Sequence, residues 1–395
     1  MTRQPAAAFT VETVASLAEV PAADWDALAP RDPLASHGWL KLIEEELGDG
    51  VEIRYALVRQ GKELVAGVPC YLCYRGSRLM DPNQLMFGRF RRLPELLHIS
   101  FLPTMLVGPF RSYGPKLLFS DALDKRAREL VGKVLLGTVE DLARSRSLPI
   151  QIPKISSHSR GTQDFLLEKR FHLTRDFPVS YLDIEWDDFD GYLSYIRAFS
   201  PKMRRNIKEE MNRFRRSGIQ ILELHDPAAH NADLQKLVRG HYERLNEVAF
   251  PFSDRFFLRL KELLGDEVVF YGAFLEDRLI GFVLMLKRGG TAYLPMTGID
   301  RQRTGNEGTY FNLCYYRPIL DAITKGLQRL YFGGTLYSPK VRRGCKILGL
   351  HHAYLGASPL RHRSMKPWFA FHSTWMRRRV IPLEDLTSLR KGKRD

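Results

Sequence analysis

The chain lacks the long apolar runs that would place it in a membrane. No uninterrupted apolar stretch approaches the roughly 18–20 residues that a membrane-spanning helix needs. The sequence begins MTRQPAAAF, without the basic segment, apolar stretch and cleavage site of a secretory signal. Signatures of G-x-S-x-G hydrolases, P-loop proteins and protein kinases are also missing. We therefore expect a cytoplasmic protein with no integral membrane segment and an activity outside these three classes.

Cysteine is scarce, and its placement argues against a structural metal. The four cysteines are Cys70, Cys73, Cys314 and Cys345. The first two form a C-x-x-C pair inside VPCYLCY, which alternates like a strand, and no second pair stands at zinc spacing. His351 and His352 are adjacent and point apart in a strand or a helix, so with His362 they make no ligand set. We predict core thiols, structural or exposed histidines and no metal site.

Positive charge is in excess, and it is confined to two segments. Of the net charge of +15, residues 197–218 carry +6 and residues 361–395 carry +7. The rest of the chain is close to neutral. Such concentration indicates a polyanionic partner. The alternative is a solvated helix face and a loose basic tail.

The length and an internal repeat indicate two similar domains. At 395 residues and 44% hydrophobic, the chain exceeds one ordinary core. PLASHGWLKLIEEE (33–46) matches PFSDRFFLRLKELL (251–264) at an offset of 218 residues, each a loop followed by an amphipathic helix. A hairpin pattern follows in both copies, at 55–72 and at 271–286. We infer a diverged duplication.

Each copy continues with alternating helices and strands. In the second copy, we expect a strand at 291–299, a helix at 308–326 that ends at Gly326, and a strand at 329–334. In the first copy, we expect a helix at about 121–146 and a strand at 149–153. This order predicts α/β units with mixed sheets flanked by helices, with a boundary near 175–185.

The loop at 298–308 carries a candidate phosphate site. Glycines that loosen the N-terminus of a helix leave backbone amides able to bind phosphate. Gln302 and Gly305 give a Q-x-x-G spacing, and Gly308 follows Asn306. The pattern resembles the pyrophosphate arm of GNAT acyltransferases, with Glu307 where the arm has glycine or alanine. The alternative is an ordinary Gly/Asn loop.

Four segments together resemble the FemAB-like branch of the GNAT superfamily. In chain order they are 199–219, 250–260, 310–330 and 337–344. The last contains S-x-K-x-x-R-G and retains Lys340, Arg343 and Gly344. The chain departs from the family in having Asn312 where a glutamate often stands, so a carboxylate that would serve as base is missing. The branch is related to the Fem enzymes, which transfer amino acids from aminoacyl-tRNA to peptidoglycan precursors.

The resemblance implies two tandem GNAT-like domains and a set of site residues. We expect domains at 1–178, on the acceptor side, and at 179–360, on the donor and catalytic side, followed by a basic aromatic tail at 361–395. The candidate catalytic residues are Lys340, Tyr316, Tyr310 and Asn312. The candidate donor-binding residues are Gln302, Gly305, Asn306, Gly308 and Arg343. Backbone amides at 297–299 are candidates for the oxyanion site, and Tyr315 is a further candidate acid.

The segment 201–217 has the signature of a basic amphipathic helix. Ser200 suits the N-cap, Pro201 the first helical position and Gly218 the C-terminal cap. The apolar residues that recur at helical spacing are Met203, Ile207, Met211 and Phe214. The candidate nucleic-acid-binding residues are Lys202, Arg204, Arg205, Lys208, Arg215 and Arg216. In Fem enzymes an added helical element helps bind tRNA, and the alternative here is pairing with an acidic helix.

The tail offers three interpretations. Residues 361–379 interleave Trp368, Phe369, Phe371 and Trp375 with basic residues. This pattern suits single-stranded nucleic acid, a peripheral contact with a membrane surface, or a helix that packs back on the core with its basic residues outward.

These features predict an N-acyltransferase. We expect it to move an aminoacyl group from aminoacyl-tRNA to the amine of a small metabolite, a peptide or a cell-wall precursor, with tRNA as partner and no tightly bound cofactor. The first alternative takes its acyl group from acyl-CoA or an acyl carrier protein. The second is an inactive GNAT-fold protein that binds RNA or a membrane surface.

Overall fold

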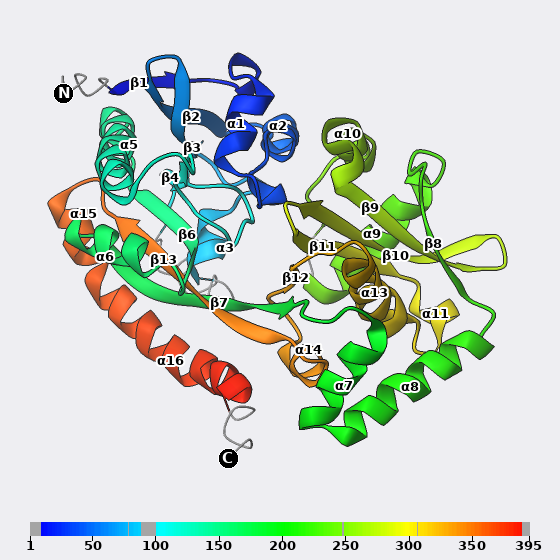
Figure 1. Ribbon diagram of the computed structural model, residues 1–395. Helices are drawn as coiled ribbons and strands as arrows, with labels where there is room; N and C mark the ends of the chain where they lie inside the picture. Colours follow the sequence, from blue (N-terminus) through cyan, green and yellow to red (C-terminus); the bar gives the residue numbers. More distant parts are fainter. Residues whose placement is uncertain (1–8, 78, 88–99, 247–248, 306, 389–395) are drawn as a thin grey trace, which may run out of the picture. The chain divides into compact units, whose positions relative to one another are not determined.

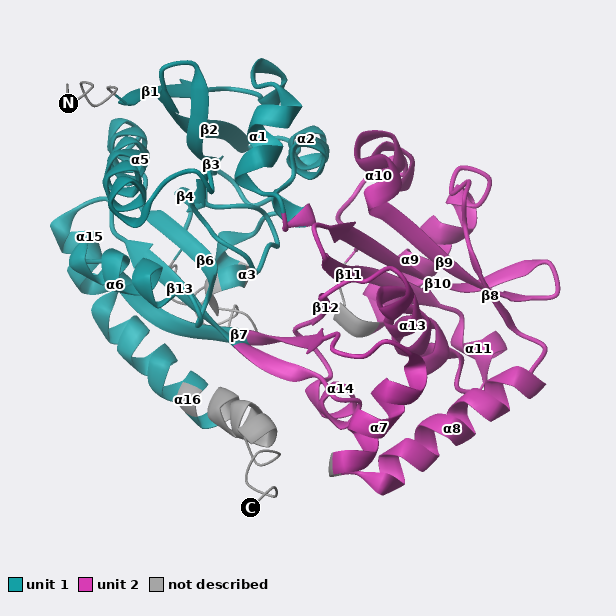
Figure 2. Cartoon of the chain, in the orientation of Figure 1, with its two compact units in different colours: residues 1–30, 34–177, 349–378 teal, residues 31–33, 178–348, 379–395 magenta. Residues whose placement is uncertain are grey.

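A computed structural model describes residues 9–388, except 78, 88–99, 247–248 and 306. The chain forms two compact units, shown in teal and magenta in Figure 2. Unit 1 comprises residues 1–30, 34–177 and 349–378, and unit 2 comprises residues 31–33, 178–348 and 379–395. Among the described residues, no helix is long and apolar enough to cross a membrane.

Unit 1 is a mixed sheet with helices. The sheet has the order β1-β2-β3-β4-β6-β13, with β5 paired to β3. Its strands are β1 (Phe9–Val14), β2 (Val51–Gln60), β3 (Glu63–Cys73), β4 (Thr104–Val107), β5 (Leu118–Phe119), β6 (Ile150–Ser156) and β13 (Lys346–Leu355). Its helices are α1 (Ala22–Leu28), α2 (His37–Glu46), α3 (Pro82–Phe87), α5 (Lys125–Ser145), α6 (Arg160–Glu168), α15 (Pro359–Ser364) and most of α16 (Lys366–Ser388). The pairing is antiparallel throughout, except between β4 and β6.

Unit 2 repeats this plan (Figure 1). Its sheet has the order β7-β12-β11-β10-β9-β8, and β11 and β12 are its parallel pair. The strands are β7 (His172–Asp183), β8 (Gln220–Glu223), β9 (Val268–Leu275), β10 (Arg278–Arg288), β11 (Thr291–Ile299) and β12 (Arg329–Gly333). The helices are α7 (Phe189–Phe199), α8 (Pro201–Arg216), α9 (Asn231–Asn246), α10 (Phe256–Leu264), α11 (Arg301–Thr304), α12 (Thr309–Phe311), α13 (Arg317–Thr324) and α14 (Tyr337–Arg342).

The two halves have the same order of elements. Unit 1 runs α2, β2, β3, β4, α5, β6, and unit 2 runs α10, β9, β10, β11, α13, β12. In both, a helix precedes an antiparallel hairpin, and the two strands that flank the later helix are parallel. This confirms the predicted tandem α/β architecture. The expected strand at 291–299 coincides with β11.

The last strand of each half closes the sheet of the other unit. β7 follows α6, yet its residues 180–183 pair with β12. β13 follows α14, yet its residues 350–355 pair with β6. Residues 349–360 therefore belong to unit 1, which differs from the expected second domain at 179–360. Backbone hydrogen bonds between strands produce this exchange of β7 and β13. The alternation of side chains along a strand does not indicate which partner strand it will pair with.

Each unit has its own apolar core. In unit 1, α5 buries Val131, Leu135 and Val139 against β2 and β3, because these residues lie at helical spacing on one stripe. Cys70 and Cys73 are buried free thiols on β3, as predicted. In unit 2, a core cluster joins one face of the β9–β10 hairpin, which carries Val269, Tyr271 and Met285, to α7, α8 and α13.

Over its described residues, the tail forms helices that pack back on the core, which is the third of the three interpretations. Phe369 is buried with Phe101 and Tyr354, and Trp368 packs against them. Arg363 on α15 and Lys366 and Arg378 on α16 are exposed. Residues 361–378 therefore form helices that pack on unit 1, and residues 389–395 lie outside the described part of the chain.

The histidines considered as metal ligands make separate contacts within the fold. His352 is buried and bonds the side chain of Gln151 at 3.1 Å, and burial lowers its pKa to about 4. His362 stacks on His172 with ring centroids 3.9 Å apart. Among the described residues, no group of three or more histidines, cysteines and acids is placed to hold a metal ion.

Candidate active site

The parallel strands of unit 2 diverge at their carboxyl ends. β11 and β12 pair only at Thr291, Ala292 and Tyr293, whereas β11 continues against β10 as far as Ile299. Ligand sites in α/β sheets form where strands part at their carboxyl ends. The amides at 297–299, which are the predicted oxyanion donors, lie on this part of β11, beyond its pairing with β12.

A widened helical turn follows this opening. Residues Asn312–Tyr316 form a π-helix between α12 and α13. Pro318 has no amide hydrogen, and its ring would clash with the carbonyl four residues earlier, at Cys314, so a regular α-helix is disfavoured here. π-Helical turns are frequent at functional sites because they redirect side chains. This one carries three of the predicted or considered site residues, Asn312, Tyr315 and Tyr316.

Lys340 is buried at the end of β12. Its side chain is 4% exposed, and its Nζ donates hydrogen bonds of 2.5 Å to the Phe332 carbonyl and 3.1 Å to the Gly333 carbonyl. No carboxylate pairs with it among the described residues. Burial lowers the pKa of Lys340 to about 8, although Cys345 and Cys314 oppose the shift. The amine therefore changes protonation state close to neutral pH.

Cys314 links Lys340 to Thr297 on β11. Cys314 lies within electrostatic range of Lys340, and its Sγ is 3.3 Å from the hydroxyl of Thr297. That hydroxyl donates a 2.6 Å hydrogen bond to the Phe282 carbonyl on β10. The sulfur is fully buried, and burial raises its pKa to about 12. Cys314 is therefore a neutral thiol, and Lys340 is the ionisable group of this cluster.

A second cluster, the Glu210 cluster, joins α8 to the π-helix. It consists of Glu210, Arg343, Tyr316, Phe311 and Asn312. Arg343 donates from Nη2 to both carboxylate oxygens of Glu210 at 2.8 and 2.9 Å and from Nε to the Tyr316 hydroxyl at 3.0 Å. That hydroxyl donates to the same carboxylate.

Aromatic packing and an amide complete the Glu210 cluster. The guanidinium of Arg343 lies 3.4 Å from the centroid of the Phe311 ring, and the side chain is only 4% exposed. The Asn312 amide donates to the Gly308 carbonyl at 3.0 Å and to the Glu210 carbonyl at 3.4 Å. Burial raises the pKa of Tyr316, and Arg343 opposes the shift.

The remaining tyrosines link the two clusters. Tyr315 stacks on Phe332 with centroids 5.1 Å apart, and the Arg343 guanidinium lies 5.7 Å from its ring. Tyr310 is partly buried beside Tyr315, and burial raises its pKa to about 12. The structure thus brings Tyr310, Tyr316, Asn312 and Arg343 together, and Tyr315 lies between them and the end of β12.

A pocket of about 780 Å³ opens beside the Glu210 cluster. Asn312, Tyr316 and Arg317 line it from the π-helix and α13, and Lys208 and Arg215 line it from α8. Asp190 lines it from α7, and Asp188 lines it from the N-cap of that helix. Two predicted catalytic residues therefore share one pocket with two predicted nucleic-acid-binding residues.

The basic helix α8 has the predicted caps and stripe. Ser200 accepts from the amide of Met203, and Gly218 has φ of +74°. Met203 and Ile207 are buried, and Met211 and Phe214 pack against the same core.

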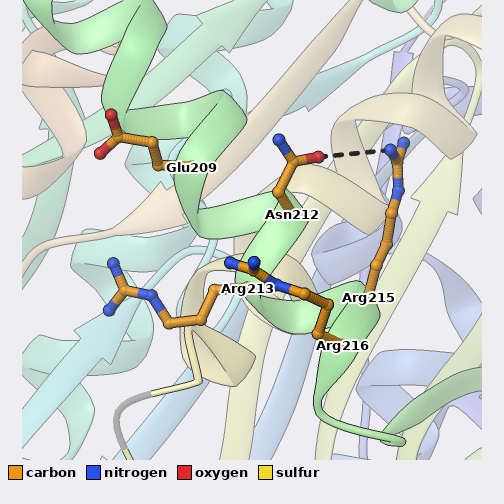
Figure 3. Close-up of a pocket in the computed structure, with 5 residues that line it drawn as sticks. All are labelled: Glu209, Asn212, Arg213, Arg215 and Arg216. Atoms are coloured by element: carbon orange, nitrogen blue, oxygen red, sulfur yellow. Dashed lines mark hydrogen bonds between the residues drawn. The ribbon is translucent and has the colours of Figure 1, made fainter.

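The basic residues of α8 face solvent. Lys202, Arg205, Lys208, Arg215 and Arg216 are exposed, and Arg204 is half-buried. In the described part of the chain, no ion pair joins any of these six to a carboxylate, so the expected alternative of an acidic partner helix is not observed. Figure 3 shows Arg213, Arg215 and Arg216 projecting from the end of the helix, where Arg215 donates a 3.4 Å hydrogen bond to Asn212.

The loop at 298–308 differs from an open phosphate arm. Residues 301–304 form the short helix α11, and the carboxylate of Asp300 accepts from the amides of Gln302 at 3.1 Å and Arg303 at 3.3 Å. A negative side chain thus occupies donors that a pyrophosphate would use. Gly305 is exposed with φ of +47°, and Asn306 lies outside the described residues.

Two of the predicted donor-binding residues serve the Glu210 cluster instead. A side chain at Gly308, where φ is +77°, would come within 3.1 Å of the Glu210 carbonyl, which explains the glycine. Arg343 is buried and bidentate on Glu210, so it presents no exposed face to a donor phosphate.

Sequence reasoning missed the carboxylate of this site. Glu210 lies within the basic segment, and its contribution there looked like a minor offset of positive charge. Its position is three residues after Ile207 and seven after Met203, which places it at the edge of the buried stripe. That spacing was the signal that could have singled it out from the exposed Glu209.

A basic group beside α11 was also missed. The Arg244 guanidinium lies 3.3 Å from the Nδ1 atom of His241, and Arg301 lies close enough to affect both residues. Burial lowers the pKa of His241 to about 4, and the two arginines add to the shift. These residues come from α9 and α11, which are distant in sequence.

Both halves have one parallel strand pair with a short ladder, β4 with β6 and β11 with β12. A family model described as peptidoglycan biosynthesis/recognition, FemAB-like, matches residues 16–390. The chain belongs to the FemAB-like family, and it is therefore an acyltransferase.

Solved structures share the fold at low identity. A FemX structure has a TM-score of 0.57 and 12% identity over 88% of this chain and 98% of its own. A tandem GNAT protein from the clavulanic acid biosynthesis pathway gives 0.50 and 14% over 89% and 99%. The C-terminal domain of a putative lysylphosphatidylglycerol synthetase from Agrobacterium fabrum gives 0.54 and 9% over 92% and 97%. No curated protein matches the chain.

Proposed function

We propose that the protein transfers an aminoacyl group from aminoacyl-tRNA to the amine of a peptidoglycan precursor. The observation that carries the proposal is the pocket that Lys208 and Arg215 share with Asn312 and Tyr316. Exposed cations along α8 suit the phosphates of an acceptor stem. A terminal aminoacyl ester bound in the pocket would then lie beside the Glu210 cluster. The family description and FemX support the peptidoglycan acceptor, and a small metabolite or a peptide has the same amine chemistry.

The reaction needs an amine, a carbonyl and a stabilised oxyanion. The amine nitrogen attacks the ester carbonyl, and a tetrahedral intermediate forms. The bond to the ribose oxygen then breaks, an amide remains, and the proton lost by the amine passes to the leaving oxygen. We propose that the amides at 297–299 and the charge of Lys340 stabilise the oxyanion. With a pKa of about 8, Lys340 suits proton transfer at neutral pH.

We assign the Glu210 cluster to positioning. The Glu210 carboxylate is neutralised by Arg343 and accepts from Tyr316, so it is a poor free base. The same contacts fix the Tyr316 hydroxyl and the Asn312 amide at the wall of the pocket. We therefore propose that Tyr316 and Asn312 orient the substrates. Glu210 and Arg343 hold these two side chains in place.

The decisive experiment compares donors in one assay. The purified protein is given a charged tRNA pool and an amine acceptor, and amide product is measured by mass spectrometry with and without prior ribonuclease treatment. We expect product only with intact tRNA, because the donor ester is part of the RNA. Equal product after ribonuclease treatment would exclude the tRNA donor.

Charge reversal on α8 should abolish tRNA binding. For the triple variant Arg205→Glu, Lys208→Glu and Arg215→Glu, we expect the affinity for tRNA to fall at least 100-fold. The slope of log affinity against log salt should also decrease by about 2, since each lost phosphate contact contributes about 0.7–0.9. Fluorescence anisotropy with labelled tRNA measures both quantities.

The matched control reverses three exposed cations of unit 1, with the same change in net charge. It carries Arg126→Glu, Lys133→Glu and Lys169→Glu, and these side chains are exposed. If the control lost as much affinity as the α8 variant, binding would depend on overall charge, and the assignment to α8 would be wrong.

A second candidate donor is acyl-CoA or an acyl carrier protein. The basic group of Arg244, His241 and Arg301 lies beside the α11 loop, where a GNAT arm would hold a pyrophosphate. An acyl-CoA-dependent enzyme should bind coenzyme A in calorimetry and should lose that binding in Arg301→Ala. The third candidate, an inactive RNA- or membrane-surface-binding protein, would form no amide with any donor.

A further inference from the structure

Unit 1 has an opening between its own parallel strands. β4 and β6 pair only at Met105 with Ile150 and at Leu106 with Gln151, as β11 and β12 do in unit 2 over a similarly short ladder. The ladder between β6 and β13 is then interrupted, because the register jumps from Ile152 to Ile155. Bulges of this kind redirect side chains beside functional sites.

A pocket of about 270 Å³ lies at this opening. Val107 and Gly108 line it where β4 ends, and Pro153 and Lys154 line it from the bulge of β6. Leu79, Met80, Leu106 and Phe110 are among its other apolar contacts. The pocket therefore lies at the position in unit 1 that corresponds to the end of the β11–β12 pairing in unit 2, with different side chains.

The polar groups of this pocket are mainly cations and hydrogen-bond donors. Arg111, Lys116 and Lys154 line it, against the single carboxylate of Asp81. Lys116 is 4% exposed, and its Nζ donates a 2.6 Å hydrogen bond to the Ser112 carbonyl. The Tyr71 hydroxyl is buried at the wall of the pocket, beside the Phe110 backbone.

Two cationic residues of the pocket have a left-handed backbone conformation. Arg111 has φ of +62° and Lys154 has φ of +58°. Such conformations cost free energy in residues other than glycine, and they recur where a ligand site needs a particular direction of the side chain. Lys154 is 3.9 Å from Asp176 and 5.9 Å from the centroid of the Tyr113 ring, which are loose contacts for a lysine.

We propose that this pocket binds a compact organic anion, with a carboxylate or phosphate held by Lys154 and Arg111 and an apolar body against Leu106 and Phe110. The volume corresponds to about nine water molecules, so it suits an apolar body plus head group of about ten non-hydrogen atoms. A mostly apolar wall with a few convergent polar groups is the usual form of a small-molecule site. The proposal does not depend on the donor used by unit 2.

Calorimetry on the full chain tests the proposal without tRNA or acceptor. Benzoate, phenyl phosphate and the neutral isostere benzamide are titrated separately. We expect one or both acids to bind at least tenfold more tightly than benzamide, because only they carry the charge. The tighter acid identifies the head group as carboxylate or phosphate. Failure of both acids to bind, or equal binding of benzamide, would overturn the proposal and leave the acyltransferase proposal untouched.

Variants locate the binding site. Lys154→Met should weaken binding of the acids at least tenfold, and Lys154→Arg should retain most of it, because the positive charge remains. Lys133→Met, at an exposed position on α5, is the matched control and should bind like the unaltered protein. Thermal unfolding of each variant checks the fold, and Arg111→Met replaces Lys154→Met if that variant unfolds. Unchanged acid binding in folded Lys154→Met and Arg111→Met would place the anion elsewhere.

Discussion

Replacing Glu210 by glutamine is expected to lower the free energy of unfolding by about 3–5 kcal/mol. The change removes the negative partner of Arg343, whose guanidinium is 4% exposed and would remain as an uncompensated buried charge. It also weakens the contact that joins α8 to the π-helix through Tyr316. Denaturant unfolding followed by circular dichroism measures the loss.

The adjacent residue provides the control for this experiment. Glu209 is on the same helix and is exposed, so Glu209→Gln removes the same charge without breaking the Glu210 cluster. We expect its unfolding free energy to change by less than about 0.5 kcal/mol. Equal losses for the two variants would show that the effect comes from the charge of α8 and would contradict the assigned role of Glu210.

Replacing Lys340 by methionine should reduce the rate of acyl transfer by about 100- to 1,000-fold, the usual loss when one group that stabilises an oxyanion is removed. Methionine has a similar length and fills the same space, so the fold should persist. Arg342→Met, on the exposed side of α14, is the matched control and should retain activity. A folded Lys340→Met protein with a normal rate would remove Lys340 from the mechanism.

The difference in unfolding free energy between the unaltered protein and Lys340→Met should depend on pH in a defined direction. Burial lowers the pKa of Lys340 from 10.5 to about 8, so between these values the unfolded chain binds the proton and the folded chain does not. Stability from this group therefore rises with pH over this window, and the penalty of protonating it is fully present below pH 8. Relative to Lys340→Met, the unaltered protein should gain up to about 3 kcal/mol between pH 7.5 and 10.5. A constant difference would mean that the amine titrates normally.

The local elements of this chain could be predicted because neighbouring residues determine them. Ser200, Pro201 and Gly218 mark the ends of α8, and the apolar residues between them define its buried stripe. β11 has the predicted limits because TAYLPMTGI is a short apolar run bounded by glycines and an aspartate. The repeat was visible for the same reason, since each copy preserves a helix and a hairpin with local signatures.

The site could be predicted only in part. Lys340, Tyr316, Asn312 and Arg343 were singled out by position in family-like segments, and the structure gathers the last three around Glu210. The partner itself was not found, because Glu210 is 133 residues from Arg343 in the chain. Likewise, the amides of the α11 loop were expected to be free, and the competing carboxylate of Asp300 became apparent only in the folded turn.

By itself, the sequence determined the elements, the duplication and the basic character of α8, because these follow from spacing, caps and charge within one segment. The tertiary structure alone decided which closing strand completes each sheet, since β7 and β13 form backbone ladders with strands far away in the chain. It also decided which charged side chains form buried ion pairs and which are exposed. Arg343 and Glu210 neutralise each other inside the fold, whereas Lys202, Arg205, Lys208, Arg215 and Arg216 of α8 are exposed. Burial and pairing depend on the whole fold, and no local pattern contains them.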